Sequence, residues 1–454
     1  MRILLVRPKR RKKSITLGEF MFSEPLGLEC IAAILRDKHE VKILDLMVGK
    51  EDFSQELIGF KPQIVGFTSL CVDVRGVKEL ALKTKEIDER VIILAGGTQA
   101  FLAPENFFCG EIDHIVKYTT QDNIRKLFYY LENGEKVPLI DGVHSRENSF
   151  QSTDVSGINE YITPDREATE KYRSHYTYFG YQPCALLQTS RGCSSHCSFC
   201  LRWKIEGGQE QDEPMENIIA QIQRIAEPSI MIIDNNFLYS QERLENFCHL
   251  LESDNIQKNF ICYASVESII HHRETLNRLS KNGLRACLVG YESFKAEELA
   301  GYNKKATIKE NILAAEILKE LGIACWASFI LNPDWNTKDF LQFRKYVKEL
   351  APEISTLTPL TALPGTLLYN KYKERILFAP DDYDQWSFSV VSIKPSKLSL
   401  RHYYFEVLKT NLYVNLLLNN PSYVIQQFGL GTVLRLIKGS LKFLLIYIKL
   451  MVKG

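Results

Sequence analysis

The sequence lacks any apolar stretch long enough to cross a membrane. Its 454 residues are 45% hydrophobic and 24% charged, but no uncharged apolar run of about 18 residues occurs. The first apolar run, residues 3–6, is too short for the core of a secretory signal. We therefore expect a cytoplasmic protein with sizeable cores in two or three domains.

The chain also lacks an excess of charge of either sign. Lys and Arg number 56 and Asp and Glu 55, which gives a formal net charge of +1. This balance gives no reason to expect a nucleic-acid partner. No separate RNA-binding module or basic domain is visible, which argues against an RNA-modifying enzyme. A secretory context for disulfides among the 11 cysteines is missing too.

Three of those cysteines are crowded into one short segment, Thr189-Ser-Arg-Gly-Cys-Ser-Ser-His-Cys-Ser-Phe-Cys200. The spacing C-x3-C-x2-C follows an apolar, strand-like run, and thiolates are the usual ligands of iron–sulfur clusters. Cys193, Cys197 and Cys200 can hold three irons of a [4Fe–4S] cluster and leave the fourth without a protein ligand. An open metal position is where a substrate can coordinate.

Zinc is the alternative interpretation, because Cys193, His196, Cys197 and Cys200 are formally a Cys3His set. Zinc sites usually bring two separated ligand pairs together. Here His196 and Cys197 are adjacent, and no second pair occurs at the required spacing. The pattern therefore favours the cluster.

The cysteine segment resembles the cluster motif of the radical S-adenosylmethionine (radical SAM) enzymes. Phe199 matches the aromatic residue that this family places near the adenine. The resemblance implies that the open iron chelates S-adenosylmethionine. Electron transfer then releases a 5′-deoxyadenosyl radical, which is chemistry that belongs to the cofactors.

The first 140 residues alternate short apolar strands with helical stretches, as in a parallel sheet covered on both faces. Strands are expected at 3–6, 41–46, 64–68, 91–95 and 114–116, and helices at about 26–37, 74–88 and 121–132. Ligands of such sheets bind at the carboxyl ends of the strands. The sequence predicts a doubly wound, Rossmann-like domain over residues 1–140.

This domain resembles the cobalamin-binding domain that precedes many radical SAM barrels. The resemblance rests on Pro25-Leu-Gly-Leu28, on His39-Glu-Val-Lys-Ile-Leu-Asp45 and on two turns at strand ends. It implies that these turns contact the corrin, where glycine allows a close approach. The residues expected to do so are Thr68, Ser69, Leu70, Gly96, Gly97 and Thr98.

Two departures from the cobalamin-binding pattern are visible. The Asp-x-His-x-x-Gly motif is absent, which implies cobalt without a protein histidine. The family often has Gly-Gly-Pro-His and Gly-Glu-Gly where this chain has Gly96-Gly-Thr-Gln99 and Tyr118-Thr-Thr-Gln121. The alternatives are therefore a relic that no longer binds the corrin, or a plain doubly wound domain without ligand.

A polar linker with a tyrosine-rich end is expected at residues 141–183, where prolines punctuate the sequence. Strand–helix alternation then resumes over 184–370. Strands are expected at 184–189, 229–234, 259–265, 285–291, 323–331 and 354–359. Six such units resemble the partial (β/α)6 barrel of the radical SAM enzymes, whose active sites lie at the carboxyl ends of the strands.

The expected rim of this barrel carries the candidate contacts to S-adenosylmethionine. Asp234 and Asn235 end the second strand and resemble an Asp-Asp-x-Phe motif of cobalamin-dependent members. Gly290 and Glu292 resemble the Gly-x-Glu-Ser motif after the fourth strand, and Ser265 follows the third. A carboxylate there can accept charge-assisted hydrogen bonds. The structural alternatives are a helix N-cap for Asp234 and a surface carboxylate for Glu292.

The C-terminal region, residues 371–454, contains no acidic residue after Glu406. Five cations between residues 433 and 453 fall on one face of a helix, and leucines fall on the other. This pattern is typical of a helix lying in a membrane interface. The alternative is a helix docked on the barrel or on a dimer partner.

Taken together, these features predict a radical SAM enzyme with a [4Fe–4S] cluster, S-adenosylmethionine and cobalamin as cofactors. Family resemblance implies methyl transfer to an unactivated carbon of a small molecule or lipid, with a flavodoxin or ferredoxin as electron donor. Radical rearrangement, cyclisation or elimination without methylation is the first alternative. A non-catalytic iron–sulfur scaffold protein is the second.

Overall fold

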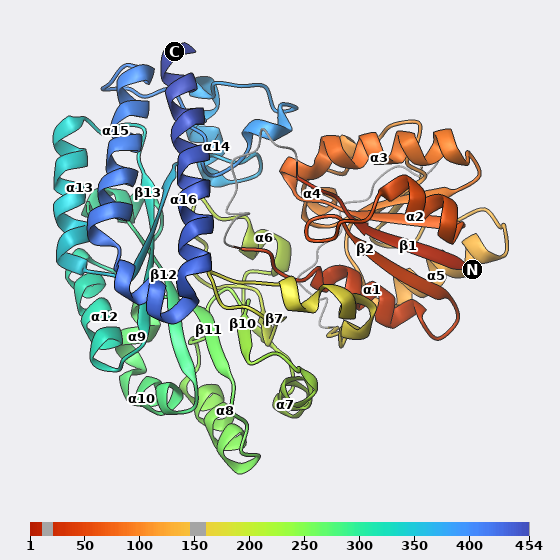
Figure 1. Ribbon diagram of the computed structural model, residues 1–454, viewed down its shortest axis with the longest axis horizontal. Helices are drawn as coiled ribbons and strands as arrows, with labels where there is room; N and C mark the ends of the chain where they lie inside the picture. The colour runs from red at the N-terminus through yellow and green to blue at the C-terminus, as the bar shows by residue number, and fades with distance from the viewer. Residues whose placement is uncertain (11–20, 146–159, 454) are drawn as a thin grey trace. The chain divides into compact units, whose positions relative to one another are not determined.

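The computed structural model describes residues 1–10, 21–145 and 160–453 (Figure 1). They form two compact units. The described part of the first unit comprises residues 1–10, 22–145, 160–176 and 380–386. The described part of the second unit comprises Met21 and residues 177–379 and 387–453.

The first unit contains a six-stranded sheet in the order β2-β1-β3-β4-β5-β6. Strands β1 to β5 run parallel to one another, and β6 pairs antiparallel with β5. The bounds are β1 Arg2–Arg7, β2 Glu40–Asp45, β3 Ile64–Thr68, β4 Ile92–Gly96, β5 His114–Val116 and β6 Val143–Ser145.

Helices cover both faces of this sheet, because successive strand residues point to opposite sides. Leu4 and Val6 pack with the helices α2 (Phe53–Phe60), α3 (Val74–Ile87) and α4 (Thr98–Leu102). Ile3 and Leu5 pack with α1 (Leu26–Leu35) and α5 (Gln121–Glu132). The predicted doubly wound domain is confirmed.

Much of the expected linker 141–183 belongs to the two units themselves. Residues 146–159 lie outside the described residues, but β6 belongs to the first sheet and the 3-10 helix Arg166–His175 belongs to the first unit. Buried Tyr176 donates a hydrogen bond to Asp45, at 3.0 Å. The second unit starts at Thr177. The polar composition of this segment does not reveal these contacts, because they join segments far apart in the sequence.

The second unit contains a parallel, open six-stranded sheet in the order β14-β13-β12-β11-β10-β7. This is the predicted partial barrel. The bounds are β7 Cys184–Leu187, β10 Ser229–Ile232, β11 Asn259–Ala264, β12 Leu284–Glu292, β13 Ala324–Leu331 and β14 Ile354–Pro359.

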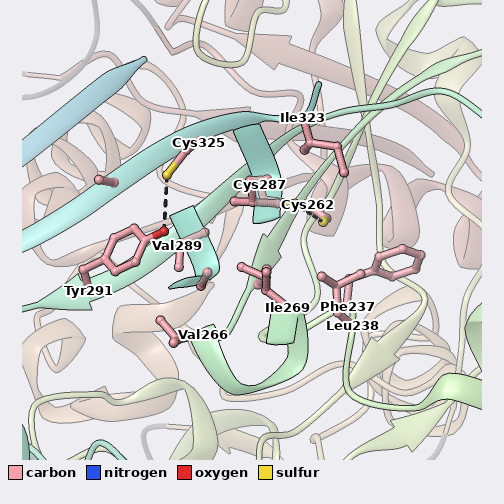
Figure 2. Packing of buried hydrophobic residues seen from close by; sticks show 14 of the residues in the cluster. Phe237, Leu238, Cys262, Val266, Ile269, Cys287, Val289, Tyr291, Ile323 and Cys325 are labelled. Carbon is pink, nitrogen blue, oxygen red and sulfur yellow. Dashed lines mark hydrogen bonds between the residues drawn. The ribbon is translucent and has the colours of Figure 1, made fainter. Parts of the chain in front are cut away.

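Helices follow the barrel strands and bury one face of the sheet. They are α7 (Met215–Arg224), α8 (Gln241–Ser253), α9 (Val266–His271), α10 (Arg273–Lys281), α12 (Ile308–Glu320) and α13 (Thr337–Leu350). Figure 2 shows part of this core, where Cys262 and Cys287 lie on neighbouring strands with sulfurs 3.8 Å apart. Cys325 contacts the hydroxyl of Tyr291 at 3.3 Å. These buried cysteines pack in the core of the sheet.

The C-terminal region adds the helices α14 (Leu367–Tyr372), α15 (Leu400–Tyr413) and α16 (Pro421–Lys453). Helices α15 and α16 pack against each other (Figure 1). Gly429 interrupts α16 with a non-helical backbone. No helix among the described residues combines the length and apolarity that crossing a membrane requires.

Candidate active site

The loop that carries Cys193, Cys197 and Cys200 is closed at its base by backbone pairing. Strand β8 (Ser190–Arg191) pairs antiparallel with β9 (Gln211–Asp212), and the Cys193 amide donates to the Gly207 carbonyl at 3.1 Å. Gly192 has φ +83°, and a Cβ there would lie 1.9 Å from the Gln209 carbonyl oxygen. Only glycine fits this closure.

Asp234 fixes the chain just before this loop. It is fully buried, and its oxygens accept hydrogen bonds from the Thr189 amide at 2.7 Å, the Thr189 hydroxyl and the Ser190 hydroxyl at 2.8 Å. Arg243 donates to the Thr189 carbonyl at 2.9 Å. Burial raises the pKa of Asp234, while these hydrogen bonds and the Arg243 charge oppose that rise. The structure thus engages Asp234 with the loop itself.

Asn235 holds the two ends of the loop together. Its amide donates to the Gly192 carbonyl at 2.8 Å and to Glu206 at 2.9 Å, and its oxygen accepts from Arg202 at 2.6 Å. Arg202 and Glu206 belong to α6 (Arg202–Glu206), directly after the last cysteine. The Arg202 amide also donates to the Cys200 sulfur, at 3.4 Å. Hydrogen bonds to thiolate sulfur are one means of tuning a cluster.

A segment that sequence reasoning missed holds the middle of the loop. Helix α11 (Ala296–Gly301) ends there, and the Gly301 carbonyl accepts from the Ser198 hydroxyl at 2.9 Å. The Asn303 amide donates to the carbonyls of Ser195 and His196, at 3.2 and 3.0 Å. No hydrophobic periodicity in the sequence marks this segment. Its role is evident only from its contacts with residues about a hundred positions away in the chain.

Lys304 completes the segment and pairs with Glu292. Its Nζ lies 3.2 Å from Glu292 Oε1 and donates to the Gly290 carbonyl at 3.1 Å. A Cβ at Gly290 would lie 2.3 Å from that carboxylate oxygen, so glycine makes room for the ion pair. Glu292 is buried and has φ +60°, beside a register shift between β12 and β13. Backbone strain of this kind is concentrated at functional sites.

The ion pair lies within electrostatic reach of the cluster ligands. Burial raises the pKa of the Cys197 thiol to about 11, and the Lys304 cation acts in the opposite direction. Burial alone lowers the pKa of Lys304, but the charges of Glu292 and Cys197 raise it above its ordinary value. A lysine held as a cation offsets the negative charge of thiolates.

The two remaining predicted contacts have different surroundings. Phe199 meets Tyr302 edge to face, with ring centroids 5.7 Å apart, and packs against a small apolar cluster. Ser265 is the N-cap of α9 and accepts from the Ser268 amide at 3.1 Å. An N-cap hydroxyl is used mainly by its own helix.

These residues fit a [4Fe–4S] cluster. Three thiols lie on one short loop, all three are free, and the backbone between them is held from several sides. Among residues 1–10, 21–145 and 160–453, no three or more His, Cys, Asp or Glu side chains are grouped to hold a metal ion. A cube of four irons instead takes one thiolate at each of several corners, so its ligands are spread more widely.

In the first unit, the predicted corrin contacts lie at the carboxyl ends of β3 and β4. Leu70, Gly97 and Thr98 are exposed, whereas Ser69 is buried and its amide donates to the Gly96 carbonyl at 3.0 Å. Gly97 has φ +91°, and a Cβ there would lie 2.7 Å from the Ser69 nitrogen. The two turns, residues 68–70 and 96–98, therefore pack tightly. Together they form a ledge with few side chains, which fits a flat macrocycle.

The two departures from the family pattern have local explanations. The amide of the Gln99 side chain donates to Asn106 at 2.7 Å, and the Gln99 backbone donates to the Ser69 carbonyl at 3.1 Å. Thr120 caps α5 and forms a capping box with Asn123. Both replacements stabilise the fold of this edge of the sheet.

Two protein-family models match the chain in the two units. Residues 21–127 match the B12 binding domain, and residues 187–347 match the radical SAM superfamily. The first match contains the ledge, and the second contains the cysteine loop, the strands β10–β13 and Lys304.

Several known proteins are similar over most of the chain. Hopanoid C-3 methylase of Methylococcus capsulatus is 28% identical over 86% of this chain and 76% of its own. An uncharacterized methyltransferase of Pyrococcus horikoshii is 24% identical, with coverage of 81% and 82%.

Solved structures show the same fold. The cobalamin-dependent S-adenosylmethionine radical enzyme OxsB, with aqua-cobalamin bound, has a TM-score of 0.70 at 16% identity, covering 91% of this chain and 67% of its own. The radical S-adenosylmethionine methyltransferase TsrM of Kitasatospora setae, with cobalamin and a [4Fe–4S] cluster bound, has a TM-score of 0.64 at 16% identity, with coverage of 82% and 74%. With the two family-model matches, the chain belongs to the radical SAM enzymes that carry an N-terminal B12 binding domain.

Proposed function

We propose that the protein cleaves S-adenosylmethionine reductively and transfers a methyl group to an unactivated carbon of a small-molecule or lipid substrate. The observation that carries this proposal is the three-cysteine loop on a chain that also has a B12 binding domain. Asn235 and the segment that contains Lys304 hold this loop in place. When bound, the [4Fe–4S] cluster would supply the electron that cleaves one S-adenosylmethionine, and cobalamin would carry to the substrate a methyl group taken from a second S-adenosylmethionine.

The residues of the chain then have distinct roles. Cys193, Cys197 and Cys200 hold the cluster, and Asn235 keeps the loop closed around it. Glu292 presents a carboxylate at the end of β12 that can accept hydrogen bonds from the ammonium or ribose of S-adenosylmethionine. Phe199 packs beside the adenine. An electron donor of the flavodoxin or ferredoxin type reduces the cluster.

The cobalamin contacts are assigned to the ledge of the first unit. Thr68, Ser69, Leu70, Gly96, Gly97 and Thr98 form it, and the exposed members are Leu70, Gly97 and Thr98. Because no Asp-x-His-x-x-Gly motif is present, no histidine from that motif reaches the cobalt.

An apolar substrate is favoured by the names of three relatives. The relative with 28% identity is named as a hopanoid methylase. Relatives with about the same coverage are named as magnesium-protoporphyrin ester cyclases and as a bacteriochlorophyllide methyltransferase. All three names denote large, mainly apolar molecules.

The proposal is tested with the anaerobic full-length protein, loaded with iron, sulfide and cobalamin, and supplied with S-adenosylmethionine bearing a trideuterated methyl group. A lipid extract and a tetrapyrrole mixture serve as substrate pools. We expect a product heavier by one trideuteromethyl group and 5′-deoxyadenosine in the same reaction. Labelled product that forms equally with a Cys197→Ala variant would refute the proposal.

Radical rearrangement or cyclisation without methylation is the second candidate. It is favoured by Gln99, which replaces the histidine of the usual Gly-Gly-Pro-His turn and donates to Asn106. It is also favoured by the relatives named as cyclases. The absorption spectrum of protein that has been supplied with cobalamin and then freed of unbound corrin decides between the two candidates. A spectrum without a corrin band excludes methyl transfer from cobalamin. Unchanged S-adenosylmethionine under strong reduction would instead indicate a non-catalytic scaffold.

A further inference from the structure

One side of α16 presents an unbroken apolar stripe to solvent. Seven side chains, each exposed by 44 to 75%, recur at intervals of four and three residues: Leu430, Leu434, Ile437, Leu441, Leu445, Ile448 and Val452. On a helix with 3.6 residues per turn, this spacing places all seven on one face. Exposed apolar patches of this extent mark interaction surfaces.

The opposite side of α16 is fixed to the second unit. Tyr447 is fully buried, and its hydroxyl donates to the Ser389 carbonyl at 2.6 Å. Its ring packs against Phe443, at 4.1 Å between centroids, and edge to face against Tyr404 of α15. These contacts fix the rotation of the helix about its axis, so the stripe faces outward in the folded chain.

Cations run along one border of the stripe. Lys438, Lys442 and Lys449 are exposed, and their positions on the helix lie about a quarter of a turn from the centre of the stripe. No acidic residue follows Glu406, whereas six lysines and arginines do. The C-terminal part of the chain is therefore apolar and purely cationic on its exposed side.

We propose that this stripe, with Lys438, Lys442 and Lys449, seats α16 in the surface of an anionic membrane. An apolar helical face bordered by lysines matches lipid tails and headgroup phosphates at the interface. A second copy of the same surface would bring like charges together, which disfavours a self-complementary dimer. The helix lies in the plane of the membrane, since no described helix is suited to crossing it. This inference does not depend on methyl transfer.

The test is co-sedimentation of the full-length protein with vesicles of phosphatidylcholine alone or mixed equally with phosphatidylglycerol. We expect sedimentation with the mixed vesicles and its loss at high salt. The double variant Lys438→Gln/Lys442→Gln should bind at least about tenfold more weakly, since each cation near an anionic surface contributes about fivefold. Leu441→Glu/Leu445→Glu should bind at least as poorly, because it removes the apolar contact.

Leu313→Glu/Leu341→Glu is the matched control, because these leucines are exposed on α12 and α13. It should sediment like the wild type, and circular dichroism should show all variants folded. Wild-type protein that stays in the supernatant would overturn the proposal. So would equal binding by the control and by the leucine variant. A concentration-dependent dimer that only Leu441→Glu/Leu445→Glu abolishes, without vesicle binding, would assign the stripe to a second copy instead.

Discussion

Lys304 Nζ lies 3.2 Å from Glu292 Oε1, and the same lysine donates to the Gly290 carbonyl at 3.1 Å. The pair connects the end of β12 to the segment that holds the cysteine loop. A buried ion pair contributes little net stability, but breaking it leaves one charge uncompensated. Its position beside Cys197 therefore points to a role in the reaction.

Lys304→Met should slow the chemistry in addition to destabilising the second unit, because it leaves Glu292 without its partner. Without the cation, negative charge near the cluster is no longer offset, so the reduction potential should become more negative. Reductive cleavage of S-adenosylmethionine should slow by at least about tenfold, as for other residues around metal ligands. Redox titration followed by electron paramagnetic resonance measures the potential. Lys304→Arg keeps the charge and should retain most activity; equal losses in both variants would contradict this account.

Asn235→Ala should loosen the loop that holds the cluster. The variant removes hydrogen bonds to Gly192, Arg202 and Glu206 at once. Loss of such outer contacts typically costs about 10- to 100-fold in metal affinity. Iron retained per chain after a chelator challenge is the measurement. Asn236→Ala is the control, since Asn236 bonds Ser265 and Ser268 instead; if both variants lose iron alike, the clamp is not specific.

Gly97→Ala should displace the ledge in the first unit. The new Cβ would lie 2.7 Å from the Ser69 nitrogen, at a backbone angle that disfavours side chains. We expect cobalamin affinity to fall at least about tenfold, which costs about 1.4 kcal/mol. The corrin absorption band after desalting reports binding. Gly110→Ala meets no atom within 4 Å and should bind like the wild type; unaltered binding by both would place the corrin elsewhere.

Glu29 should make the first unit less stable as pH rises. Burial and the neighbouring Glu24 charge raise the pKa of Glu29 to about 8 from its ordinary 4.5. Between these values the folded state keeps a proton that the unfolded state has lost. Its stabilising contribution is therefore complete below pH 4.5 and is lost as pH rises through 8.

Glu29→Gln should flatten this dependence, because an amide does not titrate. Calorimetric midpoints at pH 5 and pH 8 measure it, with about 2–4 °C expected for each kcal/mol of stability. Glu167→Gln, an exposed carboxylate of the same region, should keep the wild-type slope. A Glu29→Gln midpoint that still falls as steeply as that of the wild type would refute the assignment.

The sequence predicted the strands of the two six-stranded sheets to within two residues at each end, except β6, which it missed. Each predicted strand is an apolar run bounded by turn residues, and some of the following helices have side-chain N-caps, such as Thr120 for α5 and Ser240 for α8, so the signal is local. The cysteine loop was visible for the same reason. The linker prediction failed because residues 166–176 are polar in sequence but gain burial from Glu29 and Asp45, more than a hundred residues away.

The site's supporting contacts could not be predicted, because they depend on pairings between distant segments. Asp234 and Asn235 were expected at the rim as contacts to S-adenosylmethionine, and only the fold shows that they bond the cysteine loop. Gly290 was expected to contact S-adenosylmethionine, and its absent side chain makes room for Lys304. Lys304 itself follows Glu292 by twelve residues with no helical or strand periodicity between them.

The release of 5′-deoxyadenosine from S-adenosylmethionine tests the central claim most directly. Anaerobic wild-type protein with reconstituted iron and sulfide, under strong reduction, should release it and should contain about four irons per chain. Cys193→Ala, Cys197→Ala and Cys200→Ala should each abolish release. Undiminished release by any of the three variants, or wild-type protein that takes up zinc instead of iron, would contradict the account.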